Sequence, residues 1–486
     1  MRINFSLFYV YIQNACTSTL FNTAYKPRKH VYNKHRMRHF VTMGAMTFST
    51  QNSSNQTKST LTEYLPNFLN DKALNLLRDG YLFAGKLRRK AGLPADSQTP
   101  ITFQMLGKTT TLVRGEEGVR AFYDSSRFKR AGAMPKFVSG PLFGDGAVHA
   151  LDGEAHKVRK EQMIALAYDD ARVAQIKPLL AEEVEKTLRE WKDEEGNVYD
   201  DFAKAYGRAA FRWAGLPMDE DEMNERAEQY SRLLDTFGRP QSNPVAWVER
   251  KRLDRWAEGV IEQIRAGIME VDENSVAGQV ARFVDEDGVL LNAKTAGIEL
   301  QNLTRPTVAV SRFAAFAAAA LVENQPWIER IRTASGRELI DVPEAIAFAQ
   351  EVRRTKPFVP MLPAIATQDT EVSGCPIHKG QRILIDILNT NTGPKSWQAA
   401  GTFDPERFMD VDDYEAITTF LPQGGMDVHT GHRCPGEKIA IAALSIAVAA
   451  LCRPEVKIDD DQEDVTFSWK HMLTRPETGV RVKVQR

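Results

Sequence analysis

A cysteine in a glycine-rich loop, directly before a long apolar segment, is the feature that most restricts what this chain can fold into. The loop covers residues 423–437, and its glycines 424, 425 and 431 suit a backbone that must approach another group closely. Pro435 is predicted to be the first residue of the following helix, because its missing N–H costs nothing there. Cys434 would then lie at a helix N-terminus, where the helix dipole and the neighbouring His432 and Arg433 favour a thiolate.

The other three cysteines do not share this setting. Cys16, Cys375 and Cys452 show no C-x-x-C spacing, and four cysteines in 486 residues do not form a disulfide scaffold, which indicates a reducing compartment. A thiolate on haem iron promotes cleavage of an O–O bond, so we predict that Cys434 is the axial ligand of a haem b. From the residues alone, a buried structural cysteine is the alternative.

The periodicity of apolar residues predicts a mainly α fold with a small β part. Apolar residues recur at helical spacing in two segments, Leu180–Trp191 and Leu253–Ile264. Two short alternating segments around Gly107-Lys108 predict a hairpin, and 383–388 is predicted to be another strand. The apolar stretch 439–452 is shorter than the roughly 20 residues that a membrane-spanning helix needs, so we expect a buried helix and no transmembrane segment.

The first 62 residues differ in charge from the rest of the chain. They contain eight Lys or Arg residues and no acidic residue, whereas the whole chain has a net charge of −1. Such a leader is similar to a mitochondrial transit peptide, with an intracellular location, and the alternatives are a disordered tail or a later start at Met43 or Met46. We expect one domain over 63–486. The near-neutral charge gives no indication of a nucleic-acid partner.

Two further motifs precede the cysteine loop. Glu351 and Arg354 have E-x-x-R spacing on one face of a predicted helix, and residues 403–408 read Phe-Asp-Pro-Glu-Arg-Phe. In this order and near the C-terminus, they resemble the cytochrome P-450 superfamily and its haem-thiolate fold. The resemblance implies that Glu351, Arg354 and Arg407 form a buried ion network that braces the haem-side core and is structural.

The predicted helix over the haem lacks the acid–alcohol pair that is usual in monooxygenases of this superfamily. Arg305-Pro306 stands at that position. A guanidinium in so apolar a helix is costly unless an anion pairs with it, and Pro306 is expected to kink the helix. We therefore predict that Arg305 binds a substrate carboxylate, the alternative being that it faces solvent or pairs with a protein acid.

Arg305-Pro306 and the sequence Gly-His-Arg-Cys-Pro-Gly-Glu at 431–437 narrow the resemblance to the fatty-acid peroxygenases, some of which form olefins. The similarity runs from about Leu61 to the C-terminus and includes Asp79-Gly80-Tyr81-Leu82-Phe83. It implies an oxidoreductase that hydroxylates long-chain fatty acids at the α or β carbon with hydrogen peroxide. The substrate carboxylate would act as acid and base, and no reductase would be needed.

The same resemblance implies roles for further residues. His149 would lie above the haem, where a histidine is found in the olefin-forming relatives. Two interpretations stay open: His149 is a spectator side chain, or it promotes decarboxylation of some substrate to a terminal alkene. Catalysis would then involve Arg305, Pro306 and His149. The expected haem-propionate partners are Arg130, His156, Lys160 and His432, and the expected pocket residues are Phe143 and Phe358.

Three other functions compete with this interpretation. A reductase-dependent fatty-acid monooxygenase would need NAD(P)H, and a haem isomerase would consume preformed fatty-acid hydroperoxides. A non-catalytic haem carrier would leave Arg305 without a role. Chain-length preference, the ratio of α to β products and the oligomeric state do not follow from the sequence.

Overall fold

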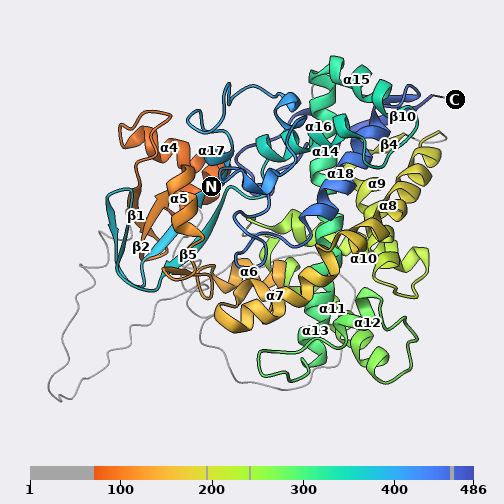
Figure 1. The fold of residues 1–486 in the computed structure, drawn as a ribbon, viewed down its shortest axis with the longest axis horizontal. Helices are drawn as coiled ribbons and strands as arrows, with labels where there is room; N and C mark the ends of the chain where they lie inside the picture. The colour runs from red at the N-terminus through yellow and green to blue at the C-terminus, as the bar shows by residue number, and fades with distance from the viewer. Residues whose placement is uncertain (1–69, 193–194, 240–241, 460–464, 486) are drawn as a thin grey trace, which may run out of the picture. The chain divides into compact units, whose positions relative to one another are not determined.

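The computed structural model describes residues 70–192, 195–239, 242–459 and 465–485. The predictions for residues 1–62 lie outside this part of the chain. Helices dominate it, as expected (Figure 1). They are α3 (Ala73–Asp79), η1 (Gly80–Leu82), α4 (Phe83–Lys90), α5 (Gly115–Phe122), α6 (Lys136–Phe143), η2 (Val148–Ala150), α7 (Gly153–Ala167), α8 (Asp170–Glu190), α9 (Val198–Trp213), α10 (Glu220–Thr236), α11 (Asn243–Arg265), α12 (Val276–Val280), α13 (Ala293–Ala309), α14 (Ser311–Glu323), α15 (Gln325–Ser335), α16 (Pro343–Thr355), α17 (Ile387–Asn391), η4 (Pro405–Phe408), η5 (Tyr414–Ala416) and α18 (Glu437–Leu451).

The strands form three small sheets. The largest has the order β1-β2-β8-β5-β3, and the others are β4-β10-β9 and β6-β7. The strands are β1 (Ile101–Met105), β2 (Lys108–Val113), β3 (Phe128–Lys129), β4 (Gly196–Asn197), β5 (Met361–Ala366), β6 (Thr370–Val372), β7 (Cys375–Ile377), β8 (Arg382–Asp386), β9 (Val456–Ile458) and β10 (Arg481–Val484).

The predicted hairpin is confirmed, and the strand predicted over 383–388 extends two residues beyond the end of β8. In the hairpin β1 pairs antiparallel with β2, from Ile101 opposite Leu112 to Met105 opposite Lys108. Strand β8 ends at Asp386 because the side chain of that residue accepts a hydrogen bond from Asn389 N and caps α17. The last two residues of the predicted strand are therefore helical.

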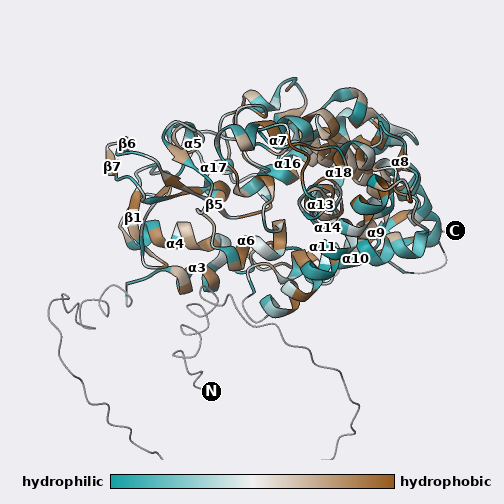
Figure 2. Ribbon diagram, turned by 90° about the horizontal axis from the view of Figure 1, so that it is seen from below, coloured by the Kyte–Doolittle hydropathy of each residue, from teal (hydrophilic) through white to brown (hydrophobic). Residues whose placement is uncertain are grey.

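The core surrounds α13, α14 and α18. Helices α9, α11, α16 and α18 pack against the α13–α14 pair, which lies inside the helical part in the view of Figure 2. The predicted apolar faces are confirmed, since Leu180, Val184 and Leu188 are all buried. Every residue of α18 except Lys438 is buried, as predicted for residues 439–452.

We expected no segment long and apolar enough to span a membrane, but the described residues contain one such stretch. Residues Ala293–Glu323 form a helical stretch of 31 residues that is apolar enough to cross a membrane, although 83% of its most apolar window is buried inside the protein. Such burial is typical of a core helix. The stretch was not recognised in the sequence because Arg305 and Arg312 interrupt its run of apolar residues.

One proline prediction needs correction, and the other stays a prediction. Helix α18 begins at Glu437 with Gly436 as its N-cap, so Pro435 lies in the preceding turn and is not the first helical residue. The kink expected at Pro306 stays a prediction, because helix α13 continues through this residue to Ala309 and is interrupted at Val310. A proline deletes its own helical hydrogen bond, but the bonds of its neighbours hold the helix together for the next turn.

Candidate functional site

The cysteine loop lies against the N-terminal end of α18. The backbone N–H of Cys434 donates to the carbonyl oxygen of Gln423 at 3.0 Å, which closes the loop. Gly424 has φ +93°, and a Cβ atom there would lie 2.7 Å from the carbonyl oxygen of His432, so the loop requires a glycine at this position. Burial and the charge of Glu437 raise the pKa of the Cys434 thiol. The helix terminus alone therefore does not produce the thiolate that we expected, because burial and Glu437 oppose it.

A buried ion network that the sequence analysis missed holds this loop. Glu437 accepts hydrogen bonds from Arg433 Nε at 2.6 Å and from Arg353 Nη2, and Arg353 also donates to Gln423 Oε1 at 2.9 Å. None of the Arg353, Arg433 and Glu437 side chains is more than 1% exposed. Helix α16 therefore fixes both ends of the loop. The signal available in the sequence was Arg353, directly before Arg354, and Glu437, three residues after Cys434.

The expected network of Glu351, Arg354 and Arg407 is confirmed. Arg354 donates to both carboxylate oxygens of Glu351, at 2.6 and 2.7 Å, and both side chains are fully buried. Arg407 Nε lies 3.7 Å from Glu351 Oε1. Arg354 also donates to three backbone carbonyls, those of residues 391, 400 and 402. The network therefore connects α16 to the segment before η4 and has a structural role.

Four basic side chains gather between α7 and the cysteine loop. The rings of His156 and His432 stack with centroids 4.1 Å apart, and Lys160 Nζ donates to the carbonyl oxygens of Gly431 and Arg433 at 2.9 and 2.7 Å. The Arg130 guanidinium lies 3.9 Å from the centroid of the Phe122 ring, and its Nη1 atom is buried without a hydrogen-bond partner.

Desolvation makes the charged forms of these four groups unfavourable. Burial lowers the pKa of Lys160 to about 8, that of Arg130 to about 10, and that of His156 to about 4. Burial and the charge of Arg130 lower the pKa of His432 to about 2. A cluster of buried basic groups with lowered pKa values is suited to bind an anion, because the attraction of an anion would offset the cost of desolvating their charged forms.

Arg305 is buried in the middle of α13. It donates through Nη2 to Asn302 Oδ1 at 2.8 Å and through Nη1 to the carbonyl oxygen of Leu142, and its Cζ lies 5.8 Å from the Phe143 ring centroid. Burial, followed by the charge of Arg250, lowers the pKa of Arg305 to about 9. No acidic side chain in the described ranges forms an ion pair with Arg305, so the alternative of a protein acid as its partner has no support there.

Pro306 and His149 differ from their neighbours in accessibility. Every residue from 301 to 321 is buried except Pro306, which is half-buried. His149 has more than a third of its surface accessible, yet desolvation by the surrounding protein lowers its pKa to about 3. His149 also stacks on Phe143, with ring centroids 4.1 Å apart.

An apolar cluster lies next to Arg305. Its buried members are Leu142, Leu234, Ala309 and Leu473, and Phe143, Phe237, Phe358 and Val359 are half-buried against them. Phe143 and Phe358 were predicted from the sequence. The other members come from α6, the end of α10 and the residue after it, α13, the segment before β5 and the C-terminal loop, so no local pattern connects them. The cluster begins beside the guanidinium, because the carbonyl group of Leu142 is its hydrogen-bond acceptor.

Comparison with known proteins agrees with this arrangement. Residues 322–484 match the family model described as Cytochrome P450. The solved structure of cytochrome P450SP alpha (CYP152B1) is 32% identical, with a TM-score of 0.77, and the alignment covers 85% of this chain and 98% of that protein. Cytochrome P450 OleT is 27% identical with a TM-score of 0.78, and the alignment covers 85% and 96%. This chain belongs to the cytochrome P450 family.

Matches to curated sequences are shorter or more distant. Ferruginol synthase of Salvia miltiorrhiza is 39% identical over 129 residues, which are 25% of this P450 and 24% of that protein. Sterol 14alpha-demethylase of Mycolicibacterium vanbaalenii is 24% identical over 72% of this chain and 82% of that protein. This P450 therefore spans about a quarter of the first curated relatives it matches, whereas the CYP152 structures match it over nearly their full length and confirm the narrower resemblance.

The residues of this P450 fit the haem with a cysteine thiolate ligand that its family implies. Cys434 would hold the iron, because metal coordination deprotonates a thiol and offsets the burial that raises its pKa. The propionates would meet the basic cluster of Arg130, His156, Lys160 and His432, in which Arg130 has an unpaired buried nitrogen. The structure thus brings these four predicted residues together on one side of the cysteine loop.

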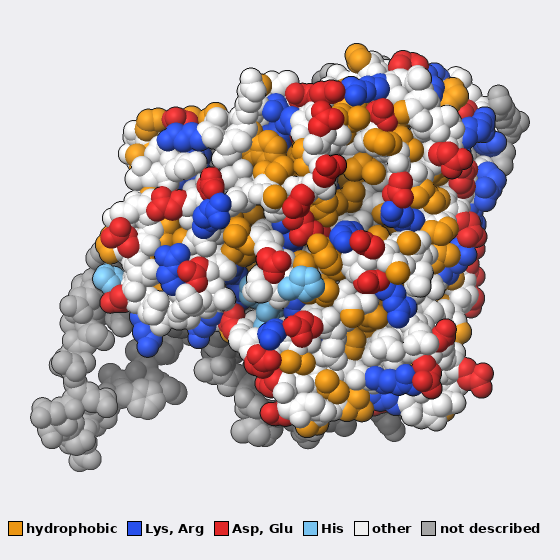
Figure 3. Space-filling view, in the orientation of Figure 1, with side chains coloured by type: hydrophobic (Ala, Val, Ile, Leu, Met, Phe, Trp, Pro, Cys, Tyr) orange, Lys and Arg blue, Asp and Glu red, His pale blue; other side chains and the backbone are white. Residues whose placement is uncertain are grey.

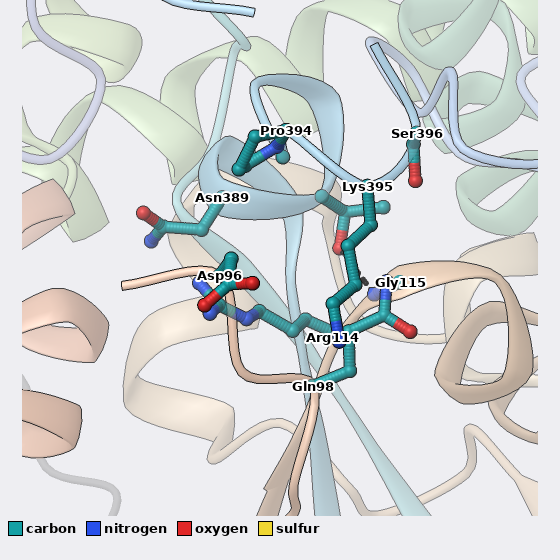
Figure 4. Close-up of a pocket in the computed structure, with 10 residues that line it drawn as sticks. Asp96, Gln98, Arg114, Gly115, Asn389, Pro394, Lys395 and Ser396 are labelled. Carbon is teal, nitrogen blue, oxygen red and sulfur yellow. Dashed lines mark hydrogen bonds between the residues drawn. The ribbon is translucent and has the colours of Figure 1, made fainter. Parts of the chain in front are cut away.

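Two cavities lie away from this site. One, lined by Asp96, Arg114, Asn389 and Lys395 among others (Figure 4), has a volume of about 10 Å³, enough for one water molecule. The other, of about 300 Å³, lies beside Lys72, Phe83 and Lys90. Neither contains a predicted site residue. Charges of both signs are interspersed on the face shown in Figure 3, which has no extended basic patch of the kind that nucleic acids require.

Proposed function

We propose that this P450 uses hydrogen peroxide to hydroxylate long-chain fatty acids at the α or β carbon, with Arg305 as the carboxylate-binding residue. Its family and its CYP152 neighbours support an oxidoreductase. The observation that carries the finer proposal is the buried guanidinium of Arg305 beside an apolar cluster. An unpaired buried charge costs several kcal/mol or more, so the site favours a ligand that supplies the missing anion.

The ion pairs around Arg305 support this view. Arg250 lies 2.5 Å from Asp254, and Arg159 lies 2.9 Å from Glu299, so each of these two arginines has a carboxylate partner. Arg305 is the third cation of this group and has no such partner among the described residues. The group therefore carries one excess positive charge, which one monocarboxylic acid would neutralise.

The site can also orient the carboxylate and bind the alkyl chain of such a substrate. A carboxylate can accept two parallel hydrogen bonds from a guanidinium, which fixes its orientation as well as its position. The alkyl chain would pack against the apolar cluster around Phe143, Phe358 and Leu473. With the carboxylate fixed, only the first carbons of the chain can lie over the haem, which supplies the oxidising chemistry when it is bound through a thiolate.

Proton transfer would fall to the substrate. Arg305 and Pro306 replace the acid–alcohol pair, and neither can move a proton, because Pro306 has no N–H and a guanidinium stays protonated. A carboxylate held by Arg305 can accept and return a proton, so it would act as acid and base. Hydrogen peroxide already carries the two electrons that a reductase would otherwise transfer to dioxygen, so no redox partner is expected.

Two solved relatives contain carboxylic acids. Cytochrome P450SP alpha (CYP152B1) has been solved in complex with (R)-ibuprophen, and a single-residue variant of OleT in complex with arachidonic acid. Both ligands combine a carboxylate with an apolar body. They support a substrate of the same class for this chain.

His149 favours a second product from the same substrate. It stacks on Phe143, and the charge of Arg305 contributes to lowering its pKa. A neutral imidazole beside the bound carboxylate can donate and accept a proton, which favours loss of carbon dioxide and a terminal alkene from part of the substrate.

Turnover of tetradecanoic acid with hydrogen peroxide alone tests the proposal, with wild type compared with Arg305→Ala. We expect hydroxy acids from the wild type and about a 100-fold loss of kcat/KM in the variant, since truncating one partner of a buried charge pair costs about 2–5 kcal/mol. Turnover only with NAD(P)H and a reductase would favour a monooxygenase, and turnover of preformed hydroperoxides without added peroxide would favour an isomerase. Undiminished activity in the variant contradicts the role of Arg305.

A further inference from the structure

A fully buried carboxylate, Glu299, precedes Arg305 by less than two turns on α13. Its Oε1 atom accepts hydrogen bonds from the backbone N–H of Val148 at 2.8 Å and from Arg159 Nη1 at 2.9 Å. Its Oε2 atom accepts one from Asn302 Nδ2 at 3.0 Å. Glu299 thus joins α13 to α7 and to η2, which contains His149.

Asn302 connects this carboxylate to Arg305. The amide of Asn302 donates through Nδ2 to Glu299 at 3.0 Å and, over a longer distance of 3.4 Å, to the carbonyl oxygen of Phe143, and it accepts through Oδ1 from Arg305 Nη2 at 2.8 Å. An asparagine has one donor side and one acceptor side, so the partner of one side determines what the other side offers. A carboxylate can only accept. Glu299, with the shorter of the two hydrogen bonds from Nδ2, therefore holds the nitrogen of Asn302 toward itself and the oxygen toward the guanidinium, and the Phe143 carbonyl favours the same orientation.

We infer that Glu299 is a positioning residue for substrate binding: by orienting the Asn302 amide it provides the acceptor that holds the Arg305 guanidinium toward the substrate carboxylate. The inference rests on the proposed function, since it assigns Glu299 a role in holding the same carboxylate-binding group. It adds a residue that touches neither substrate nor haem.

The substitution Glu299→Gln tests the inference with almost no change of shape. The Gln oxygen must keep facing Val148 N and Arg159, so its NH₂ group faces Asn302. Asn302 then has to turn its oxygen toward residue 299 and its NH₂ group toward Arg305, which also breaks its 3.4 Å hydrogen bond to the Phe143 carbonyl. Two donors would meet, and the guanidinium would lose its acceptor and move.

The measurement is the dissociation constant of tetradecanoic acid, followed by the change it causes in the Soret band of the haem-loaded protein, with 1-tetradecanol as the neutral ligand of equal length. We expect Glu299→Gln to weaken acid binding about tenfold, which corresponds to one hydrogen bond to a charged group, and to leave alcohol binding unchanged. In the background of Asn302→Ala, the same substitution should cause no further loss, because the connecting amide is absent.

Glu183→Gln is the matched control. Glu183 is a buried carboxylate that accepts from Arg208 Nε at 2.6 Å and Arg212 Nη1 at 2.7 Å, between α8 and α9 and apart from the site. We expect this variant to be destabilised without any change in the ratio of acid to alcohol affinity. A parallel loss of acid and alcohol binding in Glu299→Gln, or additive losses in the double variant, would overturn the inference. A wild type that binds acid and alcohol equally would instead contradict the proposed function itself.

Discussion

The rings of His149 and Phe143 stack with centroids 4.1 Å apart and planes inclined by 24°. The stack joins η2 to the end of α6, whose Leu142 carbonyl is bound by Arg305. The imidazole and the Arg305 guanidinium are thereby held by the same two segments. If Arg305 binds the substrate carboxylate as proposed, these segments would also determine where His149 lies relative to the substrate.

Replacing His149 should change the products more than the rate of substrate consumption. In His149→Gln the stacked imidazole is lost, but Arg305 keeps its partners, so hydroxylation with peroxide should continue. We expect the share of terminal alkene among the products to fall at least severalfold. Analysis of extracted products by gas chromatography and mass spectrometry measures that share. An unchanged share in the variant would show that His149 has no part in alkene formation.

His149 should also contribute to the pH dependence of stability. Its pKa is lowered to about 3 by desolvation and then by Arg305, whereas an unfolded histidine titrates near 6.5. Between these values the unfolded chain binds the additional proton, so the free energy of unfolding decreases as the pH falls from 6.5 toward 3. His149→Gln should therefore lose less stability than wild type between pH 7.5 and 5.0, measured as the shift of the urea midpoint. Part of the wild-type loss should remain, because the pKa of His156 is lowered in the same direction. Equal shifts in both proteins would contradict the assignment.

The shape of the Arg305 guanidinium should matter as well as its charge. Arg305→Lys retains a positive charge but offers a single ammonium group in place of the planar fork. We expect KM for tetradecanoic acid to rise about tenfold, the equivalent of one charge-assisted hydrogen bond, with a smaller effect on kcat. Steady-state kinetics with hydrogen peroxide separates the two constants. A variant with wild-type KM would show that charge alone recruits the substrate.

The parts of the site that could be predicted from the sequence are those that depend on short spacings. The cysteine loop, the pair of Glu351 and Arg354, and the hairpin of β1 and β2 each occupy a few consecutive residues, so their residue types already carry the signal. The lone Arg305 in an apolar helix was also recognisable, because burying an unpaired charge is costly wherever the helix packs.

Other parts depend on contacts between residues far apart in the chain. Arg353 and Glu437 are 84 residues apart, and Glu299 reaches Val148 across 151 residues, so neither contact leaves a local pattern. The sequence predicted a lowered pKa for the Cys434 thiol, but burial and Glu437 raise it and outweigh the effect of the helix terminus. The burial of a side chain cannot be inferred from a loop sequence. The β8–α17 boundary depended on whether Asp386 continued the strand or capped a helix.

The network around Glu351 should be important for stability and not for catalysis. Glu351→Gln removes the charge that Arg354 needs while both side chains are fully buried, so we expect a loss of about 3–5 kcal/mol in the free energy of unfolding. Glu406→Gln is the matched control, because Glu406 pairs with Arg330 at the surface, where the two side chains are 57% and 40% exposed and such pairs contribute about 0–1 kcal/mol. Urea unfolding followed by circular dichroism measures both values. The protein that remains folded should keep the wild-type ratio of acid to alcohol affinity in either variant. Equal stability losses in the two variants would show that the buried pair contributes no more than a surface one.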